Sequence, residues 1–387
     1  MYLPTVTAFF LAASVAPVIA ATTDLQVIAL CDDTHYRHSE GSAIVLPDGK
    51  VLLVWTRFDG HKNRCGHLGD NGPATLVMAE SIDDGRTWTE PVPLPVGTAS
   101  RNIMQAAFVP VKDRLMLAFS VRMREGHTST KYAIESTDGG KTWSERRKIV
   151  DAGGANDRCI RLGRGRILMA LHNATSERRV GGKKDRDVLV AASDDEGRTW
   201  TVTNPIPHVP HPMETRAENP LPLLIAEPAL AECSDGSVFM LARSSVGVFY
   251  QSRSSDGGTT WSDLEPTTIP TFAAPPYLFR VDDGRIGLLW NPIAGRSAAK
   301  AEEAIQNQIT VPYGPRQRLA MMLSSDDGKT WSEPITVAED GRNGFCYPWT
   351  YQAKDRTLRI FCSRTPEIIY PTDLVQLPPL KLESTQQ

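Results

Sequence analysis

Arginines, carboxylates and a tyrosine occur at separated points of this chain, and together these residue types could bind a carboxylate and carry out acid–base or nucleophilic chemistry. A planar guanidinium donates paired hydrogen bonds that fit a carboxylate better than an ammonium group does. A carboxylic acid or a phenol beside it can serve as proton donor, base or nucleophile. The residues of interest are Arg37, Glu40, Arg57, Arg64, Asp70, Gln105, Asn156, Asp157, Glu227, Arg243, Arg316, Arg318 and Tyr347.

A repeated eight-residue motif shows how a fold can bring such distant residues together. Its copies open at Ser81, Ser136, Ser193, Ser254 and Ser324, and each keeps Ser first, Asp third, Gly fifth and Thr-Trp last. Successive copies begin 55 to 70 residues apart, which is enough for four short strands, or one blade of a β-propeller. The Asp can accept hydrogen bonds from turn amides, the Gly supplies a positive φ, and the Trp covers apolar surface. We therefore assign these motifs, called boxes below, a structural role and not a catalytic one.

The spacing predicts an all-β chain folded as a six-bladed β-propeller. In the first repeat, strands at Ser42–Leu46, Val51–Thr56 and Ala74–Glu80 precede the box, with a Gly turn between the first two. After the last box, residues 348–362 hold two strands that begin a sixth blade without a box of its own. We expect the N-terminal segment Leu25–Leu30 to supply the missing edge strand and close the ring.

Strand direction predicts which residues share one mouth of the ring. In an antiparallel blade, the start of the first strand and the connection between the second and third strands lie on one side, and the box lies on the other. The candidate residues named above all stand at places of the first kind. We therefore expect them to converge on the central opening, opposite the boxes, as an anion-sugar site.

The boxes and these positions resemble the bacterial-type exo-sialidases of the Asp-box, or BNR-repeat, superfamily over nearly the whole chain after residue 20. The resemblance implies an arginine triad for the substrate carboxylate, a tyrosine nucleophile with a glutamate base, an aspartate acid/base, and further residues that contact the sugar. The matching positions are Arg37, Arg243 and Arg316 for the triad, with Arg318 as the rival for the third place; Tyr347 and Glu227 for the nucleophile and its base; Asp70 for the acid/base; and Arg57 and Gln105 for substrate contacts.

A tyrosine suits this chemistry because the anomeric carbon of a sialic acid carries its own carboxylate. An anionic Asp or Glu nucleophile would approach against like charge, whereas a phenol activated by a glutamate does not. Tyr351 is an alternative that is more simply a packing residue. Asp70, within the glycine-rich loop before the first box, would protonate the leaving oxygen and later activate water. Its alternative role is an Asp-Asn-Gly turn, which Asp70, Asn71 and Gly72 would form unaided.

Three departures from the family pattern leave the natural sugar open between a sialic acid, another 2-keto acid sugar and a uronate. The first arginine usually precedes Ile-Pro, but here His38 and Ser39 follow Arg37. Gln105 stands where many members have an Asp. The carboxylate that braces the first arginine from the last blade is missing from its usual place, and Glu40 or Glu367 is its substitute.

The leading functional prediction is a secreted, retaining exo-α-sialidase that releases a terminal sialic acid from glycans. One alternative is a lyase or glycosidase acting on uronic-acid polysaccharides, in which a histidine and a tyrosine abstract a proton. The histidines near the expected opening are His35, His38, His61 and His67. A second alternative is a non-catalytic propeller that binds glycans or proteins, since non-enzymatic receptors also carry such boxes.

Composition and the chain ends set the remaining expectations. Residues 1–20 lack charge, carry an apolar run and resemble an export signal, which leaves residues 21–387 as one propeller domain that is secreted or periplasmic. A net charge of −3 gives no nucleic-acid footprint, and no membrane span, metal or cofactor is expected. Six cysteines stand without zinc spacing; Cys346 and Cys362 either form a disulfide or remain buried thiols. The sequence does not specify an oligomeric state.

Overall fold

The computed structural model describes residues 24–64, 68–124, 129–152, 154–173, 179–180, 183–184, 187–218, 220–312, 314–366 and 371–382. The expected export signal at residues 1–20 lies outside these ranges. Within them, every helix is too short or too polar to cross a membrane.

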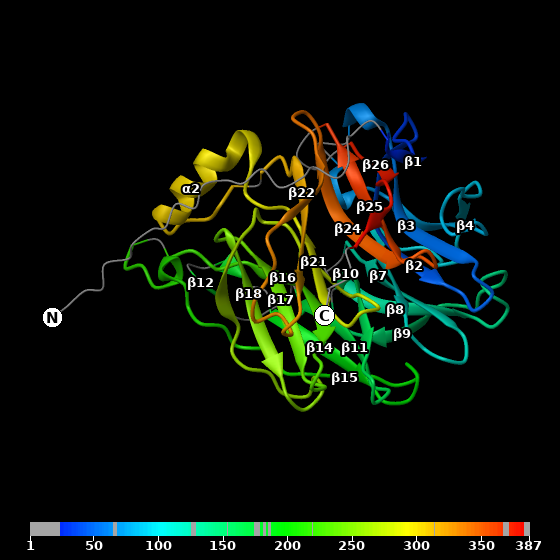
Figure 1. Cartoon of the computed structure of the whole chain (residues 1–387), viewed down its shortest axis with the longest axis horizontal. Coiled ribbons are helices and arrows are strands. Elements are labelled where there is room, and N and C mark those ends of the chain that lie inside the picture. The colour runs from blue at the N-terminus through cyan, green and yellow to red at the C-terminus, as the bar shows by residue number, and fades with distance from the viewer. Residues whose placement is uncertain are drawn as a thin grey trace.

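Six antiparallel sheets follow one another around a ring, as expected for a six-bladed propeller (Figure 1). The first three blades are β2 (His35–Val45), β3 (Val51–Asp59), β4 (Ala74–Ser81) and β5 (Val92–Pro93); β6 (Asn102–Val109), β7 (Leu115–Arg122), β8 (Ser129–Ser136) and β9 (Arg147–Val150); and β10 (Gly154–Arg161), β11 (Ile167–Asn173), β14 (Asp187–Ser193) and β15 (Thr201–Val202). The next two are β16 (Ile225–Glu232), β17 (Val238–Ser244), β18 (Val248–Ser254) and β19 (Glu265–Pro270); and β20 (Tyr277–Arg280), β21 (Ile286–Trp290), β22 (Arg318–Ser324) and β23 (Ile335–Glu339). The sixth blade is β24 (Gly344–Gln352), β25 (Thr357–Thr365), β26 (Asp373–Gln376) and β1 (Gln26–Ala29), with β27 (Leu380–Lys381) beside β25.

Short elements fill the connections between these strands. Blade three carries a small hairpin of β12 (Arg179–Val180) and β13 (Lys183–Lys184). The helical turns are η2 (Lys62–Arg64), η3 (Gly69–Asn71), η5 (Pro212–Glu214) and η6 (Gly295–Ser297), and the longer helix α2 (Ala298–Gln306) lies in the connection between β21 and β22.

The N-terminal strand closes the ring, as the sequence predicted. β1 pairs antiparallel with β26, with Gln26 opposite Gln376 and Val27 opposite Val375. Figure 1 shows β1, in blue, beside β26, in red. Both ends of the chain therefore contribute to the same blade.

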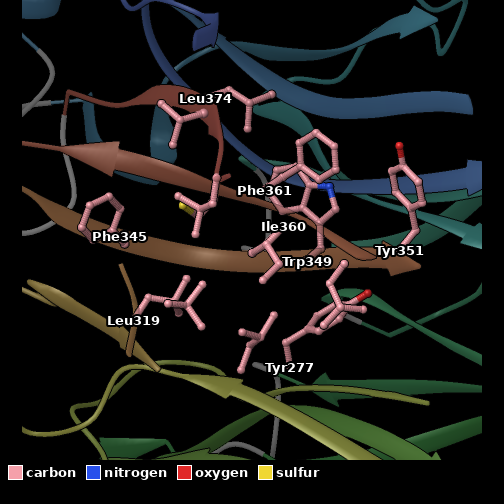
Figure 2. Packing of buried hydrophobic residues seen from close by; sticks show 14 of the residues in the cluster. Tyr277, Leu319, Phe345, Trp349, Tyr351, Ile360, Phe361 and Leu374 are labelled. Atoms are coloured by element: carbon pink, nitrogen blue, oxygen red, sulfur yellow. The ribbon is translucent and has the colours of Figure 1, made fainter. Parts of the chain in front are cut away.

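The core consists of apolar layers between neighbouring blades. Strand side chains alternate between two faces, and here both faces pack against a neighbour, so the inner strands are apolar nearly throughout. Between blades five, six and one, the rings of Trp349 and Phe361 stack at 5.9 Å beside Leu319 and Tyr277 (Figure 2). This burial holds the strands that carry the candidate site in fixed register.

Each box forms a self-contained turn at the corner of its blade. In the last copy, Asp326 accepts hydrogen bonds from Thr330 N at 2.8 Å and Thr330 Oγ1 at 2.7 Å, while Gly328 N donates to Ser324 Oγ at 2.8 Å. Gly328 has a φ of 80°, which only glycine adopts without strain. Both carboxylate oxygens of Asp326 accept hydrogen bonds within the turn, which supports the structural role predicted for the boxes.

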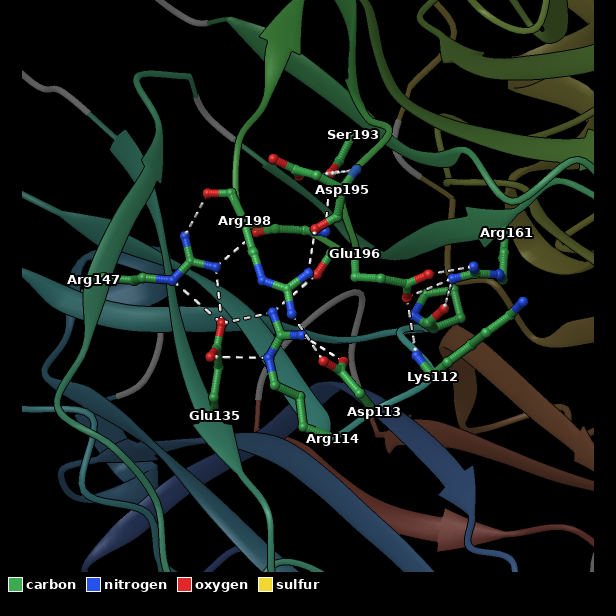
Figure 3. Close-up of polar contacts among 12 residues, drawn as sticks. Lys112, Asp113, Arg114, Glu135, Arg147, Arg161, Ser193, Asp195, Glu196 and Arg198 are labelled. Carbon is green, nitrogen blue, oxygen red and sulfur yellow. Dashed lines mark hydrogen bonds and ion pairs between the residues drawn. The ribbon is translucent and has the colours of Figure 1, made fainter.

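Ion pairs join neighbouring blades beside one of these corners (Figure 3). Glu135 of blade two binds Arg114 and Arg147 at 2.9 and 2.8 Å, and Arg147 also donates to Gly197 O of the third blade's box at 2.6 Å. Within blade three, Arg161 pairs with Glu196 at 2.5 Å, and Arg198 of blade three pairs with Asp113 of blade two at 3.0 Å. These contacts fix the corner of one blade against the next.

Cys346 and Cys362 are both buried and remain thiols. The β-sheet register places Cys346 opposite Ser363 and not opposite Cys362. Of the two alternatives for this pair, the structure has the buried thiols.

Candidate active site

In four blades, a bulge in the first strand carries one of the candidate residues. The register shifts between Ser39 and Ser42 in β2, between Met104 and Ala107 in β6, between Ala226 and Ala229 in β16, and between Cys346 and Trp349 in β24. In each shift one residue adopts a positive φ between 49° and 64°. These residues are Glu40, Gln105, Glu227 and Tyr347. Such bulges re-aim a side chain out of the pleat, and they are enriched beside active sites.

Arg37 lies fully buried on β2 between two carboxylates. Its Nη2 is 3.0 Å from Glu40 Oε1, and its Nη1 makes a short contact with Asp70 Oδ1. Its guanidinium carbon lies 4.5 Å from the centre of the Phe58 ring, so the cation is also held by an aromatic face. Glu40 thus occupies the bracing position for which it and Glu367 were the candidates; Glu367 lies outside the described residues.

Glu227 and Arg243 form a second buried ion pair. Arg243 Nη1 lies 2.6 Å from Glu227 Oε2, joining β16 to β17. The backbone N–H of Glu227 donates to His172 Nδ1 of the neighbouring blade at 3.3 Å. Both the carboxylate and the strained peptide that carries it are therefore fixed before any ligand binds.

Arg316 and Arg37 approach the same tyrosine ring from different blades. Their guanidinium carbons lie 5.4 and 5.8 Å from the ring centre of Tyr347. Arg316 is buried and donates from Nη2 to Ala273 O at 2.7 Å, while its Nε and Nη1 have no hydrogen-bond partner among the described residues. Arg318, the rival for this place, begins β22 opposite Glu339 and is only half-buried. The geometry therefore favours Arg316 as the third arginine.

The environment of Tyr347 keeps its phenol protonated. Burial raises the pKa of Tyr347 well above its ordinary value; Glu227 raises it further, while Arg316 and Arg243 lower it. Without a base this hydroxyl is a poor nucleophile. Among the carboxylates, Glu227 raises the pKa of Tyr347 more than Glu40 does.

The loop that carries Asp70 is anchored on its backbone side. Asn102 Nδ2 donates to Asp70 O at 2.8 Å and to Gly72 O at 2.9 Å, and the hydroxyl of Tyr36 donates to Gly69 O at 2.6 Å. Arg122 also donates to Asp70 O at 2.7 Å. The Asp70 side chain is 51% exposed, so its carboxyl stays accessible while its backbone is held.

Gln105 is fixed at three points. Its N–H donates to Thr56 Oγ1 at 3.1 Å, its carbonyl accepts from Lys131 Nζ at 3.4 Å, and its Oε1 accepts from Ser120 Oγ at 2.8 Å. The side-chain Nε2 has no partner among the described residues. Gln105 therefore presents two N–H donors from blade two.

Arg57 does not join this cluster through its described contacts. On β3 it stands opposite His38, whereas Phe58 stands opposite Arg37, so Arg57 and Phe58 lie on different faces of the sheet. Its guanidinium lies 3.6 Å from Asp59. The side chains of Arg64, Asn156 and Asp157 lie outside the described part of the chain.

The described histidines near this end serve structural contacts. Nδ1 of His38 accepts a hydrogen bond from Trp55 Nε1 at 3.0 Å, and burial lowers the pKa of His38 to about 4. His35 lies near Asp32 and Asp59, and His61 lies near Asp33. His67 lies outside the described residues.

Sequence reasoning missed Lys131, a buried cation beneath Gln105. It lies on β8 and is 1% exposed. Burial lowers the pKa of Lys131 to about 8, and the nearby Cys159 and Glu40 oppose that shift. The signal was present in the strand pattern, since Lys131 shares a face with buried Ala133, a place where a charged residue is unusual.

Comparison with known proteins agrees with this geometry. A family profile described as a BNR repeat-like domain matches residues 70–360, most of the chain. The chain belongs to the BNR repeat-like domain family. Its sialidase-like character follows from this match together with distant relatives that are sialidases.

Two such relatives and one solved structure illustrate how far the BNR repeat-like likeness extends. A sialidase of Micromonospora viridifaciens is 25% identical over 78% of this chain and 48% of its own length. A sialidase of Paraclostridium sordellii is 24% identical over 45% of this chain and 44% of its own. The chain thus spans about half the length of these relatives. The structure of Trypanosoma rangeli sialidase with the inhibitor DANA superposes with a TM-score of 0.64 at 13% identity, covering 91% of this chain and 59% of that one, which shows a shared fold.

Proposed function

We propose that the protein is a retaining exo-α-sialidase that releases a terminal sialic acid, or a related 2-keto acid sugar, from glycans. The observation that carries this proposal is that Arg37 and Arg316 flank the ring of Tyr347, while Arg243, from a third blade, pairs with Glu227 and lowers the pKa of Tyr347. Three guanidinium groups around one phenol suit a sugar whose reacting carbon bears a carboxylate.

The first half of the reaction transfers the sugar to Tyr347. The three arginines hold the substrate carboxylate and place the anomeric carbon near the phenol. Asp70, in its protonated form, gives its proton to the glycosidic oxygen as the C2–O bond breaks. The Tyr347 oxygen bonds to C2 while its proton passes to Glu227. The aglycone alcohol leaves, and the sugar remains bound to the enzyme.

The second half releases the sugar with its configuration retained. Asp70, now a carboxylate, takes a proton from water as the water oxygen attacks C2. The bond from C2 to Tyr347 breaks, and the phenolate recovers its proton from Glu227. Two displacements at the same carbon retain the α configuration.

The structural role of His38 gives the lyase alternative less support. A lyase needs a basic side chain at the reacting sugar, whereas His38 is buried and bonded to Trp55. The residue types at 1–20 support export to the periplasm or the medium, where glycans are available.

A hydrolysis assay tests the proposal. The purified protein should cleave a fluorogenic α-sialoside, and proton NMR should show the α-anomer as first product. Tyr347→Phe should lower kcat by at least about 100-fold, because the attacking oxygen is gone, while an unreactive sialic acid analogue still binds. Tyr351→Phe is the matched control: this tyrosine stacks on Phe361 and should retain wild-type turnover.

Three other outcomes would contradict the proposal. No turnover on any of a panel of sialosides, with unchanged glycan binding in Tyr347→Phe, would mean a binding protein. An unsaturated product from acidic polysaccharides would mean a lyase. A β-anomer as first product would exclude the covalent Tyr347 intermediate.

A further inference from the structure

Glu40 is a buried carboxylate that the proposed reaction does not use. It sits at the β2 bulge with a φ of 55° and is 3% exposed. Oε1 accepts from Arg37 at 3.0 Å, and Oε2 is buried without a hydrogen-bond partner among the described residues. A buried carboxylate oxygen without a donor is costly as an anion and less so when it carries a proton.

Arg37 faces two carboxylates of the protein itself. Asp70 contacts Nη1 and Glu40 contacts Nη2, so one positive charge is shared between two acids. An acid sugar that binds here adds a third carboxylate to the same guanidinium. Asp70 can turn toward water because its side chain is half exposed, but Glu40 is enclosed. Because Glu40 cannot turn toward water, it loses its negative charge by taking up a proton.

The surroundings of Glu40 place this protonation in the neutral range. Burial, opposed by Arg37 and aided by Asp70 and Glu227, raises the pKa of Glu40 to about 7. The charged and titratable groups around it in the described chain are Arg37 on β2, Asp70 on η3, Arg122 on β7, Lys131 on β8, Glu227 on β16 and Tyr347 on β24. A further anion beside Arg37 disfavours the charged form of Glu40 still more.

We propose that Glu40 positions Arg37 for the ligand carboxylate and takes up one proton when an acid sugar binds. This inference rests on the proposed function only in assuming an acid-sugar ligand, and it does not depend on hydrolysis. Glu40 acts through Arg37 and is a positioning residue: as an anion it orients the guanidinium in the empty site, and once protonated it leaves the full positive charge to the ligand.

Linkage fixes the direction of the pH effect. Because binding raises the proton affinity of Glu40, affinity for the acid falls as pH rises above the empty-site pKa of about 7. The fall is at most about tenfold per pH unit for one proton. Glu40 opposes the lowering of the pKa of Lys131, and this attraction is mutual, so Lys131→Met removes a cation that favours charged Glu40 and should move the whole window to higher pH.

Calorimetry measures the proton directly. The probe is 2,3-didehydro-2-deoxy-N-acetylneuraminic acid, which has no glycosidic bond to cleave. Its binding to the full-length protein is titrated at pH 7.5 in buffers of different ionisation enthalpy. We expect uptake of between about 0.4 and 0.8 proton per site in the wild type. Lys131 titrates in the same range, with a pKa of about 8, so the comparison is made in the Lys131→Met background. There Glu40→Gln keeps the shape and the acceptor for Arg37 but cannot gain a proton, so uptake should vanish and affinity should no longer vary between pH 6.5 and 8.

A matched control separates this role from a general loss of charge. Glu80→Gln removes a carboxylate of the same blade that pairs with Lys50 at 3.2 Å, and it should leave the uptake unchanged. Melting curves of all variants verify folding. The probe's own carboxylate is ionised throughout this pH range, so it does not contribute a proton.

The outcomes distinguish this inference from the proposed function. Binding without proton uptake in the wild type, or uptake that persists in Glu40→Gln, would overturn the role of Glu40 whatever the turnover assay shows. If proton uptake vanishes in Glu40→Gln and no sialoside is hydrolysed, the role of Glu40 is supported and the proposed hydrolase activity is contradicted. Failure of the probe to bind would contradict both the role of Glu40 and the proposed sialidase function.

Discussion

At the scale of single residues, the candidate site is built from side chains on strained peptides. Glu40, Gln105, Glu227 and Tyr347 share a positive φ, and so does Arg316, although a non-glycine residue in this region costs about 1–3 kcal/mol. The strain persists because long-range contacts hold each peptide, such as Thr56 to Gln105 and His172 to Glu227. Its effect is to aim five side chains, of four chemical kinds, toward the candidate site.

Exchanging guanidinium for ammonium tests the third arginine. Arg316→Lys should raise KM for a sialoside by about 10- to 100-fold, because a point charge replaces a fork that makes hydrogen bonds worth about 1.5–3 kcal/mol. Arg318→Lys is the matched control, two residues away, and should change KM by less than about twofold. Steady-state kinetics measures both. A larger effect at Arg318 would transfer the role to that residue.

The sequence could predict which residue types gather in the site, but not their pairing. Strand parity placed Arg37, Glu227 and Tyr347 at one end of the ring, and these side chains meet there. Parity could not choose between Arg316 and Arg318, since both stand near the start of one strand. Strand parity also could not predict that the Lys131 side chain is buried, because its burial depends on packing against the neighbouring blade.

At the scale of elements, each box is a turn held together by hydrogen bonds that its aspartate accepts. Asp326 accepts from Thr330 and Ser324, and hydrogen bonds from the threonine hydroxyls lower the pKa of Asp83, Asp195 and Asp326 to about 2. The turns of the boxes were predictable because the hydrogen bonds that form each turn join residues within one eight-residue copy. The bulges were not predictable, since each depends on register with the next strand.

Removing one box aspartate should destabilise the fold without touching the site. Asp326→Ala leaves the amide and hydroxyl of Thr330 without their acceptor in the turn, and we expect a lower midpoint of urea denaturation than in the wild type. Glu333→Ala, an exposed carboxylate just after the same box, should change the free energy by less than about 0.5 kcal/mol. Equal losses in the two variants would contradict the assigned role.

The same turns predict acid sensitivity. Their aspartates have folded-state pKa values below the ordinary value of about 4, so their contribution to stability is complete above pH 4 and is lost as pH falls toward 2. The urea midpoint of the wild type should therefore fall between pH 4 and 2. Asp326→Ala should show a shallower fall, and an equal slope would exclude this linkage.

At the scale of the whole molecule, the fold is a circle of apolar contacts closed by one added strand. The repeat spacing predicted the circle and its closure, because five boxes and a sixth incomplete blade leave one place for residues 25–30. Within β1, Ile28 packs against the core between blades one, five and six, while Val27 points outward and is 44% exposed. Stability of the ring should depend on one face of this strand.

A charge on either face of β1 tests the closure. Ile28→Asp puts a carboxylate against the apolar layer and should lower the unfolding free energy by about 2–4 kcal/mol. Val27→Asp, the adjacent residue on the outward face, should cost less than about 1 kcal/mol. Denaturation midpoints compare the two. If both variants match the wild type, β1 does not contribute to the closed ring.

The pairing of Gln26 with Gln376 also sets the order of events at the ribosome. The first strand to be made waits for a partner that is translated 350 residues later. Each middle blade can assemble as it emerges, because its strands are neighbours along the chain. The final step has the longest loop to close and comes only after synthesis of the sixth blade. A nascent chain stalled before β26 should therefore remain an open arc, with its opening strand exposed to proteases and chaperones.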